Sequence, residues 1–390
     1  MMRILVTSSP PIGHIHPLVP LATSLRRAGH ELRWATGPDA YAIVAGAGIE
    51  PVVAGLTATE RRQEYFRRYP EAHDLSPEEL PGHMFPRLFG TLAAPPMLDD
   101  LLSFVEGWRP DVVVHEAAEL AAPIVAAVLG VPTVNQGFGA LVHPDRMSAA
   151  SEAVGPLWEK VGLSPRPWAG SYDHLYLDIY PPSLRLPHGD YVIRRQSMRP
   201  IPYSTEIDTG AGWSGDDDGR PLIYLTFGTV FNATEGPFRN ALEGLVALDA
   251  RVLVTVGPDG DPDAFGPQPD HVTVTRYVPQ TELLPRCTLV VSHAGSGTFL
   301  AALDHGLPQL CLPQAADQFG NARQCAAAGA GLCLVPAEVT AEAVLDAASR
   351  LLTEPAFSTR SRELRNEMRA MPHPDDLVPL IEQLATGGAE

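Results

Sequence analysis

Residues 3–37 read RILVTSSPPIGHIHPLVPLATSLRRAGHELRWATG, and this stretch decides the fold. Residues 3–8 form an apolar run with β-branched side chains, which is typical of a buried parallel strand. Residues 17–30 carry apolar side chains at helical spacing and end at Gly29, and residues 31–37 resume as a strand. A strand, a helix and a strand in this order predict a βαβ unit.

The same alternation continues through the first half of the chain and starts again in the second. In the first half a strand at 110–116 leads into an alanine-rich helix at 119–130 and a short strand at 131–136. In the second half the expected strands are 221–229, 251–257, 271–277, 288–293, 309–313 and 331–335, separated by helical segments at 237–248, 281–287, 298–306, 319–329 and 340–352. This alternation predicts two doubly wound, Rossmann-like α/β domains. Because ligands bind at the carboxyl ends of such strands, we expect the domains to face each other across an active-site cleft.

Composition shifts along the chain set the expected domain boundaries. Residues 206–220 are rich in Gly, Ser and Asp, which is typical of a linker, and their three adjacent aspartates lack the fixed geometry of a metal site. We therefore expect an N-terminal domain at 1–205, a C-terminal domain at 221–370 and a final amphipathic helix, within 371–390, that packs back on the first domain. Residues 56–108 form a proline-punctuated insertion of the kind that carries binding surfaces.

The composition disfavours several classes of protein. The 28 Lys and Arg against 46 Asp and Glu give a net charge of −18, which disfavours nucleic acid as a partner. The longest apolar stretch, residues 120–134, contains two prolines and is shorter than the ~20 residues that cross a bilayer, so no membrane span is expected. The N-terminus begins directly with a strand and the four cysteines show no paired spacing, which together favour a cytoplasmic protein with reduced thiols.

The segment SHAGSGT, residues 292–298, lies between a predicted strand and a predicted helix and has the features of an anion site. N–H groups at a helix N-terminus attract negative charge, and Gly295 and Gly297 let the backbone approach a phosphate. The pattern is neither GxGxxG nor a Walker loop, which disfavours a dinucleotide or an NTP, and a plain glycine turn entering a helix explains the segment equally well. The missing GxGxxG after the first strand of the chain disfavours a nicotinamide dehydrogenase. The side chains that can donate to the anion are those of His293, Ser296, Thr298 and, after the first strand of the same domain, Thr229.

Two further segments of the second half suit a nucleotide and a sugar. Tyr277 can stack on a base, and the backbone of Val278 can pair with the edge of that base. Asp317 and Gln318 follow a strand at the same sheet edge as His293, and their carboxylate and amide suit sugar hydroxyls. From spacing alone, a helix N-cap explains Asp317 equally well.

His14 and Glu116 are the candidate catalytic residues of the first half. His14 lies in the turn after the first strand and Glu116 closes the strand 110–116, so both follow strands at the same sheet edge. A carboxylate that accepts one ring N–H fixes the tautomer of a histidine and stabilises its protonated form, which suits a general base. A structural role for His14 is the alternative. His115 alternates away from Glu116 along a regular strand and is the weaker candidate.

Four motifs in this order, GHIHP at 13–17, RYVPQ at 276–280, HAGSGT at 293–298 and PQAADQ at 313–318, resemble those of a known family. They are similar to the inverting, nucleotide-sugar-dependent glycosyltransferases of GT-B fold, in particular to the branch of antibiotic-producing bacteria that decorates natural products. The resemblance covers essentially the whole chain. It implies that His14 is the general base and that Glu116 orients it, where the family more often has aspartate. For the donor it implies a base contact at Tyr277, diphosphate contacts at Thr229, His293, Ser296, Gly297 and Thr298, and sugar contacts at Asp317 and Gln318.

The resemblance also indicates the donor. Family members that use UDP-glucose commonly have a glutamate, which binds the ribose hydroxyls, eight residues after the histidine of the HAG motif, and this chain has Ala301 there. The missing carboxylate predicts a dTDP-sugar as co-substrate, with a UDP-sugar as the alternative. No other cofactor and no metal are expected, because protein groups can stabilise the departing diphosphate.

Apolar residues of the N-terminal domain predict a pocket for a hydrophobic aglycone, lined by Met84, Phe85, Phe89, Phe138 and His143. Any of these could instead belong to the core. A non-catalytic nucleotide-sugar-binding accessory protein is the alternative from another class, and the presence of His14 argues against it. An epimerase would not need the aromatic insertion. The sequence leaves the oligomeric state open, a homodimer included.

Overall fold

The computed structural model describes residues 1–203, 218–228, 235–257 and 260–387. Contacts divide the chain into two compact units. The first consists of Met1–Tyr180, Arg185–Thr205 and Met371–Glu390, and the second of Pro181–Leu184 and Glu206–Ala370. Most of the expected linker, 206–220, lies outside the described residues, as does Thr229.

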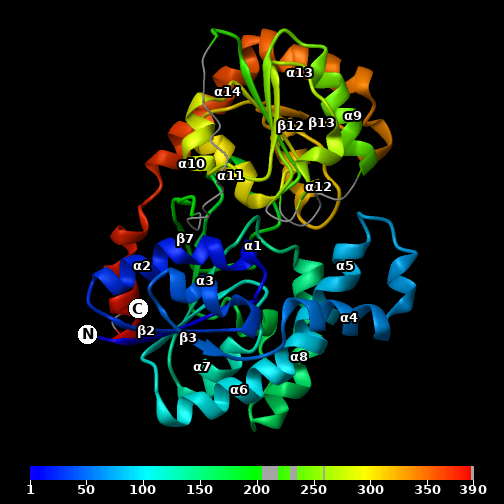
Figure 1. Cartoon of the computed structure of the whole chain (residues 1–390). Helices are drawn as coiled ribbons and strands as arrows, with labels where there is room; N and C mark the ends of the chain where they lie inside the picture. Colours follow the sequence, from blue (N-terminus) through cyan, green and yellow to red (C-terminus); the bar gives the residue numbers. More distant parts are fainter. Residues whose placement is uncertain (204–217, 229–234, 258–259, 388–390) are drawn as a thin grey trace. The chain divides into compact units, whose positions relative to one another are not determined.

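The first unit contains a seven-stranded parallel sheet in the order β3-β2-β1-β4-β5-β6-β7. Figure 1 shows the neighbouring strands β2 and β3 of this sheet beside helices of the same unit. In its centre β1 pairs with both β2 and β4, and Thr7 is level with Ala35 and His115. The turn after β1 and the residues after β4 therefore meet at one sheet edge. The strands are β1 (Arg3–Thr7), β2 (Glu31–Thr36), β3 (Glu50–Val53), β4 (Val112–Glu116), β5 (Thr133–Gln136), β6 (Leu175–Asp178) and β7 (Arg195–Ser197).

Helices pack on this sheet because its strands are apolar on their faces. Leu5 and Val113 of adjacent strands share one core with Leu98, Ile124 and Trp158 of the surrounding helices. The α-helices are α1 (Ile12–Ile15), α2 (Val19–Arg27), α3 (Tyr41–Gly46), α4 (Ala58–Arg68), α5 (Leu80–Met84), α6 (Ala94–Gly107), α7 (Ala122–Leu129) and α8 (Pro144–Lys160). Shorter helical segments are η1 (His16–Leu18), η2 (Pro38–Ala40), η3 (Pro70–His73), the π-helical η4 (Phe85–Ala93) and η5 (Pro167–Gly170).

The insertion expected at 56–108 is helical, in pieces, as predicted. Its last part, Leu80–Gly107, is one continuous stretch of α5, η4 and α6, and by length and composition alone it could cross a membrane. Phe85, Met97 and Leu101 of this stretch are buried in the main core of the first unit. Packing within the unit therefore accounts for part of the apolar surface of this stretch.

The end of the chain packs on the first unit. It consists of the 3₁₀ turn η10 (Pro374–Leu377) and α15 (Val378–Ala385). Arg27 of α2 donates to Asp375 at 2.6 Å, and Nε2 of His30 lies 3.2 Å from Oε1 of Glu382.

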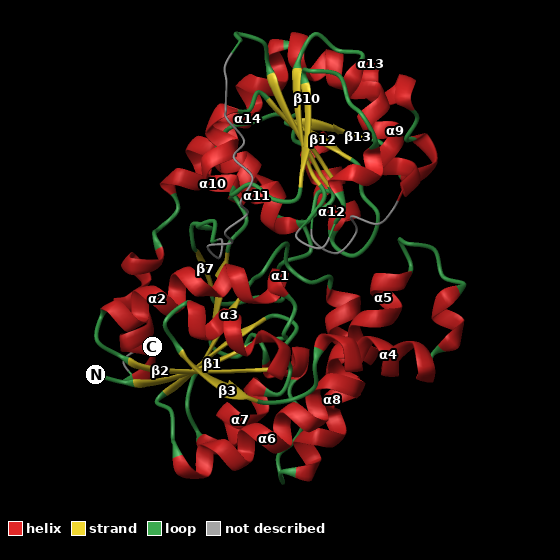
Figure 2. Ribbon diagram, in the orientation of Figure 1, coloured by secondary structure: helices red, strands yellow, loops and turns green. Residues whose placement is uncertain are grey.

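The second unit contains a six-stranded parallel sheet in the order β10-β9-β8-β11-β12-β13. Figure 2 shows this sheet between two layers of helices. Side chains alternate: Ile223 packs in a core with α9 and α13, whereas Leu222 packs in a core with α10 and α11. The strands are β8 (Leu222–Thr226), β9 (Arg251–Thr255), β10 (Val272–Thr275), β11 (Leu289–Ser292), β12 (Gln309–Cys311) and β13 (Gly331–Cys333).

The α-helices of this unit are α9 (Glu235–Val246), α10 (Gln280–Leu283), α11 (Ser296–Asp304), α12 (Gln318–Ala327), α13 (Ala341–Thr353) and α14 (Pro355–Ala370). Shorter 3₁₀ segments are η6 (Pro182–Leu184), η7 (Pro262–Phe265), η8 (Leu284–Arg286) and η9 (Pro336–Glu338). Thr226 of β8 is level with Ser292 of β11, so the segments that follow these two strands meet at one edge. Two parallel α/β units confirm the predicted fold class.

Candidate active site

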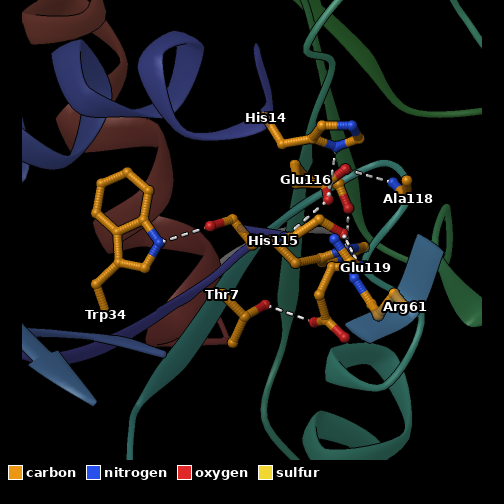
Figure 3. A network of polar contacts seen from close by, with 10 residues as sticks. Thr7, His14, Trp34, Arg61, His115, Glu116, Ala118 and Glu119 are labelled. Atoms are coloured by element: carbon orange, nitrogen blue, oxygen red, sulfur yellow. Dashed lines mark hydrogen bonds and ion pairs between the residues drawn. The ribbon is translucent and has the colours of Figure 1, made fainter. Parts of the chain in front are cut away.

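The first group of candidate residues lies where β1 and β4 end. Nδ1 of His14, on the short helix α1, lies 3.1 Å from Oε1 of Glu116, the last residue of β4 (Figure 3). The side chain of His14 is 14% exposed, whereas that of Glu116 is fully buried. The fold therefore brings the predicted pair together with part of the imidazole open to solvent.

The carboxylate of Glu116 has several hydrogen-bond donors. The backbone N–H of Ser9 donates to Oε1 at 3.1 Å, and that of Ala118 donates to Oε2. Burial alone would raise the pKa of this carboxyl, but the charge of His14 and these hydrogen bonds outweigh burial and lower it. Glu116 is therefore an anion near neutral pH, as a partner of a protonated histidine should be.

Two residues of the predicted acceptor pocket lie beside His14, and a third adjoins one of them. The ring of Phe138 stacks on the imidazole with centroids 4.2 Å apart, and Phe89 lies 5.6 Å from it. Phe85 follows at 5.3 Å from Phe89. A small hollow next to the pair is lined in part by Ser9, Phe89 and Met97.

The other two predicted acceptor residues contact different parts of the unit. Met84 packs against a small cluster that contains Tyr65 and Leu92. The ring of His143 accepts a hydrogen bond from the N–H of Asp145 at the start of α8 and lies 4.4 Å from the ring of His188. Sequence alone could not separate these two from the residues around His14.

Arg61 and Glu119, which were not predicted from the sequence, lie behind the His14–Glu116 pair and also line the hollow. Glu119 accepts hydrogen bonds from Oγ1 of Thr7 at 2.6 Å and from the N–H of Ala121 at 2.8 Å, and burial raises its pKa to about 7. Arg61 donates to Oγ of Ser9 at 3.2 Å. No signal in the sequence distinguishes Arg61 from the other arginines of ERRQEYFRR, residues 60–68.

His115, the weaker candidate, is fully buried. Its Nδ1 lies 3.1 Å from the carbonyl oxygen of Glu116. Burial lowers its pKa to about 4, so the ring is neutral at physiological pH.

The second group of candidate residues lies after β8 and β11, in the other unit. His293 follows β11, and Gly295 is the N-cap residue of α11, which begins at Ser296. The backbone N–H groups of Ser296 and Gly297 thus belong to the first turn of a nine-residue helix, where anions are favoured. Gly297 is exposed, and Oγ1 of Thr298 accepts a hydrogen bond from Gln280 at 3.1 Å.

The ring of His293 is enclosed by two glycines. A Cβ at Gly228 would lie 2.8 Å from Cε1 of His293, and a Cβ at Gly295 would lie 2.6 Å from Nε2. Real side chains do not come this close, so the position of the ring requires glycine at both sites. Burial lowers the pKa of His293 to about 4, and the neutral ring carries one N–H donor.

Asp317 and Gln318 are already bonded within the protein. Oδ2 of Asp317 accepts two hydrogen bonds from Ser296, one from its Oγ at 2.5 Å and one from its backbone N–H at 3.3 Å. The side-chain amide of Asn321 is a third donor at 3.1 Å. Gln318 is buried, and its Oε1 accepts from the N–H groups of residues 314 and 315. Asp317 precedes α12 but makes no side-chain capping bond to it. Its carboxylate instead binds the first residue of α11.

The residues expected near the nucleotide base follow β10. Tyr277 is half-buried, whereas Val278 is buried in the core cluster shared with Leu283. Ala301, eight residues after His293, packs in this same cluster.

Comparisons with known proteins identify the family of the chain. Residues 23–228 match the erythromycin biosynthesis protein CIII-like N-terminal domain, and residues 239–384 match the corresponding C-terminal domain. The L-demethylnoviosyl transferase of Streptomyces niveus is 34% identical over 378 residues, which cover 96% of each chain.

Two solved structures extend the likeness to the fold of the whole chain. The glycosyltransferase SsfS6 of Streptomyces sp. SF2575, complexed with thymidine diphosphate, has a TM-score of 0.77 and 30% identity, covering 98% of this chain and 100% of that one. Spinosyn rhamnosyltransferase SpnG, complexed with spinosyn aglycone, has a TM-score of 0.81 and 28% identity, with the same coverage. The chain therefore belongs to the erythromycin biosynthesis protein CIII-like family and is a natural-product glycosyltransferase of GT-B fold.

Proposed function

We propose that the protein transfers a sugar from a dTDP-sugar to a hydroxyl group of a hydrophobic aglycone, with inversion at the anomeric carbon and with His14 as general base. The observation that carries this proposal is the 3.1 Å contact between Nδ1 of a partly exposed His14 and the buried carboxylate of Glu116. It supports a tautomer with Nδ1–H directed at Glu116 and Nε2 available as an acceptor.

In this mechanism Nε2 of His14 takes the proton of the aglycone hydroxyl. The oxygen attacks the anomeric carbon from the face opposite the diphosphate, and the bond between that carbon and the diphosphate oxygen breaks. The imidazolium that forms is stabilised by the anionic Glu116, in the manner of other base–carboxylate pairs.

The donor assignment rests on the second unit. The first turn of α11 and the neutral ring of His293 would bind the diphosphate and stabilise its charge as it leaves. Thymidine is favoured over uridine because Ala301 offers no carboxylate to a ribose 2′-hydroxyl, and SsfS6 was solved with thymidine diphosphate. We expect the transfer to persist in EDTA.

The acceptor assignment rests on Phe89 and Phe138, whose rings adjoin His14 and suit an apolar, flat surface. SpnG was solved with an aglycone, which supports the same class of acceptor here. A cytoplasmic location stays a prediction of the sequence.

Two experiments test the proposal. Isothermal titration should give tighter binding of dTDP than of UDP, and the opposite order would contradict the donor assignment. A panel of dTDP-sugars and UDP-sugars incubated with polyketide aglycones, followed by mass spectrometry, should yield a glycoside whose anomeric configuration, read by NMR, is opposite to that of the donor. Nucleotide binding without any product would favour the accessory-protein alternative.

A further inference from the structure

Arg61 is buried, although nothing in the proposed mechanism uses it. It is 4% exposed and is the one buried Lys or Arg among the residues that the structure describes, whereas Arg62, Arg67 and Arg68 of the same helix are exposed. Burying a guanidinium is unfavourable unless anions compensate for the lost water. The position of Arg61 therefore needs an explanation.

The guanidinium lies next to the carboxylates behind His14 (Figure 3). Its Nη1 donates to Oγ of Ser9 at 3.2 Å, and the N–H of Ser9 donates to Glu116 at 3.1 Å. Burial lowers the pKa of Arg61, and the charges of Glu116, Asp39 and Glu119 raise it. Because a Coulomb interaction is mutual, Arg61 favours the ionised form of these carboxyl groups.

The charged and titratable groups around Glu116 come from several elements. His14 approaches from α1 and Arg61 from α4, while His115 is on β4 itself and Glu119 follows β4. His115, with its pKa lowered by burial to about 4, is neutral, and Glu119, with its pKa raised by burial to about 7, is only partly ionised at neutral pH. Arg61 is therefore the cation in this group whose charge does not depend on pH.

We propose that Arg61 is a positioning residue for the His14–Glu116 pair. Its guanidinium supplies positive charge behind the carboxylate and fixes Ser9, whose N–H holds that carboxylate toward His14. Arg61 also lies 5.9 Å from the ring of Phe89, which packs 5.6 Å from the imidazole. The inference rests on the proposed role of His14, but the charge of Glu116 can be measured without turnover.

The first test uses the substrate-free protein. Arg61→Gln and Arg61→Met remove the charge, Arg61→Lys keeps it, and Arg62→Gln is the matched control on the exposed face of α4. The protonation of Glu116 is followed by ¹³C NMR of carboxyl-labelled glutamate and assigned by its loss in Glu116→Gln. In a folded neutral variant the pKa of Glu116 rises, as expected when a nearby opposite charge is lost, and in the lysine and control variants it stays near the parent value. An unchanged pKa in a folded neutral variant overturns the proposal.

The second test uses the pH profile of kcat/KM. In the neutral variants the acidic limb moves to higher pH, because loss of positive charge makes the pair harder to deprotonate, and the rate lost at pH 7 returns at alkaline pH. A merely structural role would lower the rate equally at every pH and would overturn the proposal. If Glu116 titrates as predicted but no donor and acceptor give a product, the proposed function fails and the positioning of Glu116 stands; if transfer occurs and Glu116 is unaffected, the inference about Arg61 alone fails.

Discussion

The two candidate sites differ in how their polar groups are paired before any substrate binds. After β1 and β4, the carboxylate of Glu116 already has its backbone donors and its histidine partner. After β8 and β11, groups suited to bind an anion, the N–H and hydroxyl of Ser296, are bonded to the carboxylate of Asp317. If the proposed roles hold, the first site is preorganised for proton transfer, whereas a ligand bound by Ser296 in the second site would replace internal hydrogen bonds.

The largest expected effect tests whether the first site performs the chemistry. We predict that His14→Ala lowers kcat by ~10²–10⁴, the usual loss when a general base is removed. His14 belongs to the first unit, whereas the proposed diphosphate contacts belong to the second. The affinity for dTDP, measured by titration, should therefore stay within about twofold of that of the parent protein. A His14→Ala protein with undiminished turnover would make His14 a structural residue.

The next effect concerns the stability of the first site. Burial raises the pKa of Glu119 to about 7 from the ordinary value of 4.5, so between these pH values the unfolded chain loses a proton that the folded protein keeps. This group therefore destabilises the fold as the pH rises from 4.5 to 7, by up to about 3 kcal/mol. The pKa of Glu116 is lowered instead, so its contribution is lost only as the pH falls below 4.5.

Urea unfolding at pH 5, 6, 7 and 8 measures how the free energy of unfolding changes with pH. Tryptophan fluorescence suits the experiment because four of the five tryptophans, Trp34, Trp108, Trp158 and Trp168, belong to the first unit. Glu119→Gln should flatten the dependence, and Glu152→Gln, at an exposed position of α8, should not. If the free energy of unfolding changed with pH equally in the parent protein, Glu119→Gln and Glu152→Gln, the carboxyl group of Glu119 would be ionised in the folded protein.

A third, smaller effect tests the enclosure of His293 in the second site. A Cβ at Gly295 would lie 2.6 Å from Nε2 of His293 and would displace the ring, whereas Gly320 of the same unit has open space for a Cβ. A hydrogen bond to a charged group is worth about 1.5–3 kcal/mol, so loss of the proposed contact of His293 with the diphosphate should weaken dTDP binding of Gly295→Ala by roughly 10–100-fold. Gly320→Ala should bind as the parent does. Parent-like binding by Gly295→Ala would mean that His293 does not contact the diphosphate.

The sequence predicts the sheets better than it predicts these networks. The strands β1, β4, β8 and β11 are continuous apolar runs because both faces of a parallel sheet are covered, and such runs can be read directly. The edge strand β7, RQS, has no such pattern and was not expected.

Residues of the two candidate sites could likewise be predicted only where they follow a recognisable strand. His14 and Glu116 could be paired in advance because both follow strands that end at one sheet edge. Arg61 could not, since its burial depends on how the insertion packs. The bond between Asp317 and Ser296 could not either, since Ala316 before it adopts a φ of 57°, in a region that alanine rarely occupies.

The smallest predicted effect tests whether the carboxylate of Asp317 occupies the position that an anionic ligand would take in the second site. The carboxylate of Asp317 lies at the first residue of α11, where a negative charge is worth about 0.3–1 kcal/mol and where a diphosphate would compete with it. Asp317→Asn removes that charge, so dTDP should bind roughly 2–5-fold more tightly by titration, the fold-change that corresponds to this energy. Asp263→Asn, in η7 of the same unit, is the matched control and should leave the affinity unchanged.

The same substitution should act in the opposite direction on catalysis if Asp317, once released by the diphosphate, binds sugar hydroxyls. The kcat/KM for the dTDP-sugar would then fall although dTDP itself binds more tightly, because an amide accepts from a hydroxyl less strongly than a carboxylate does. A parallel loss of dTDP affinity and of kcat/KM would mean that the carboxylate only stabilises the loop. In that case both sites would be preorganised, and the contrast between them would disappear.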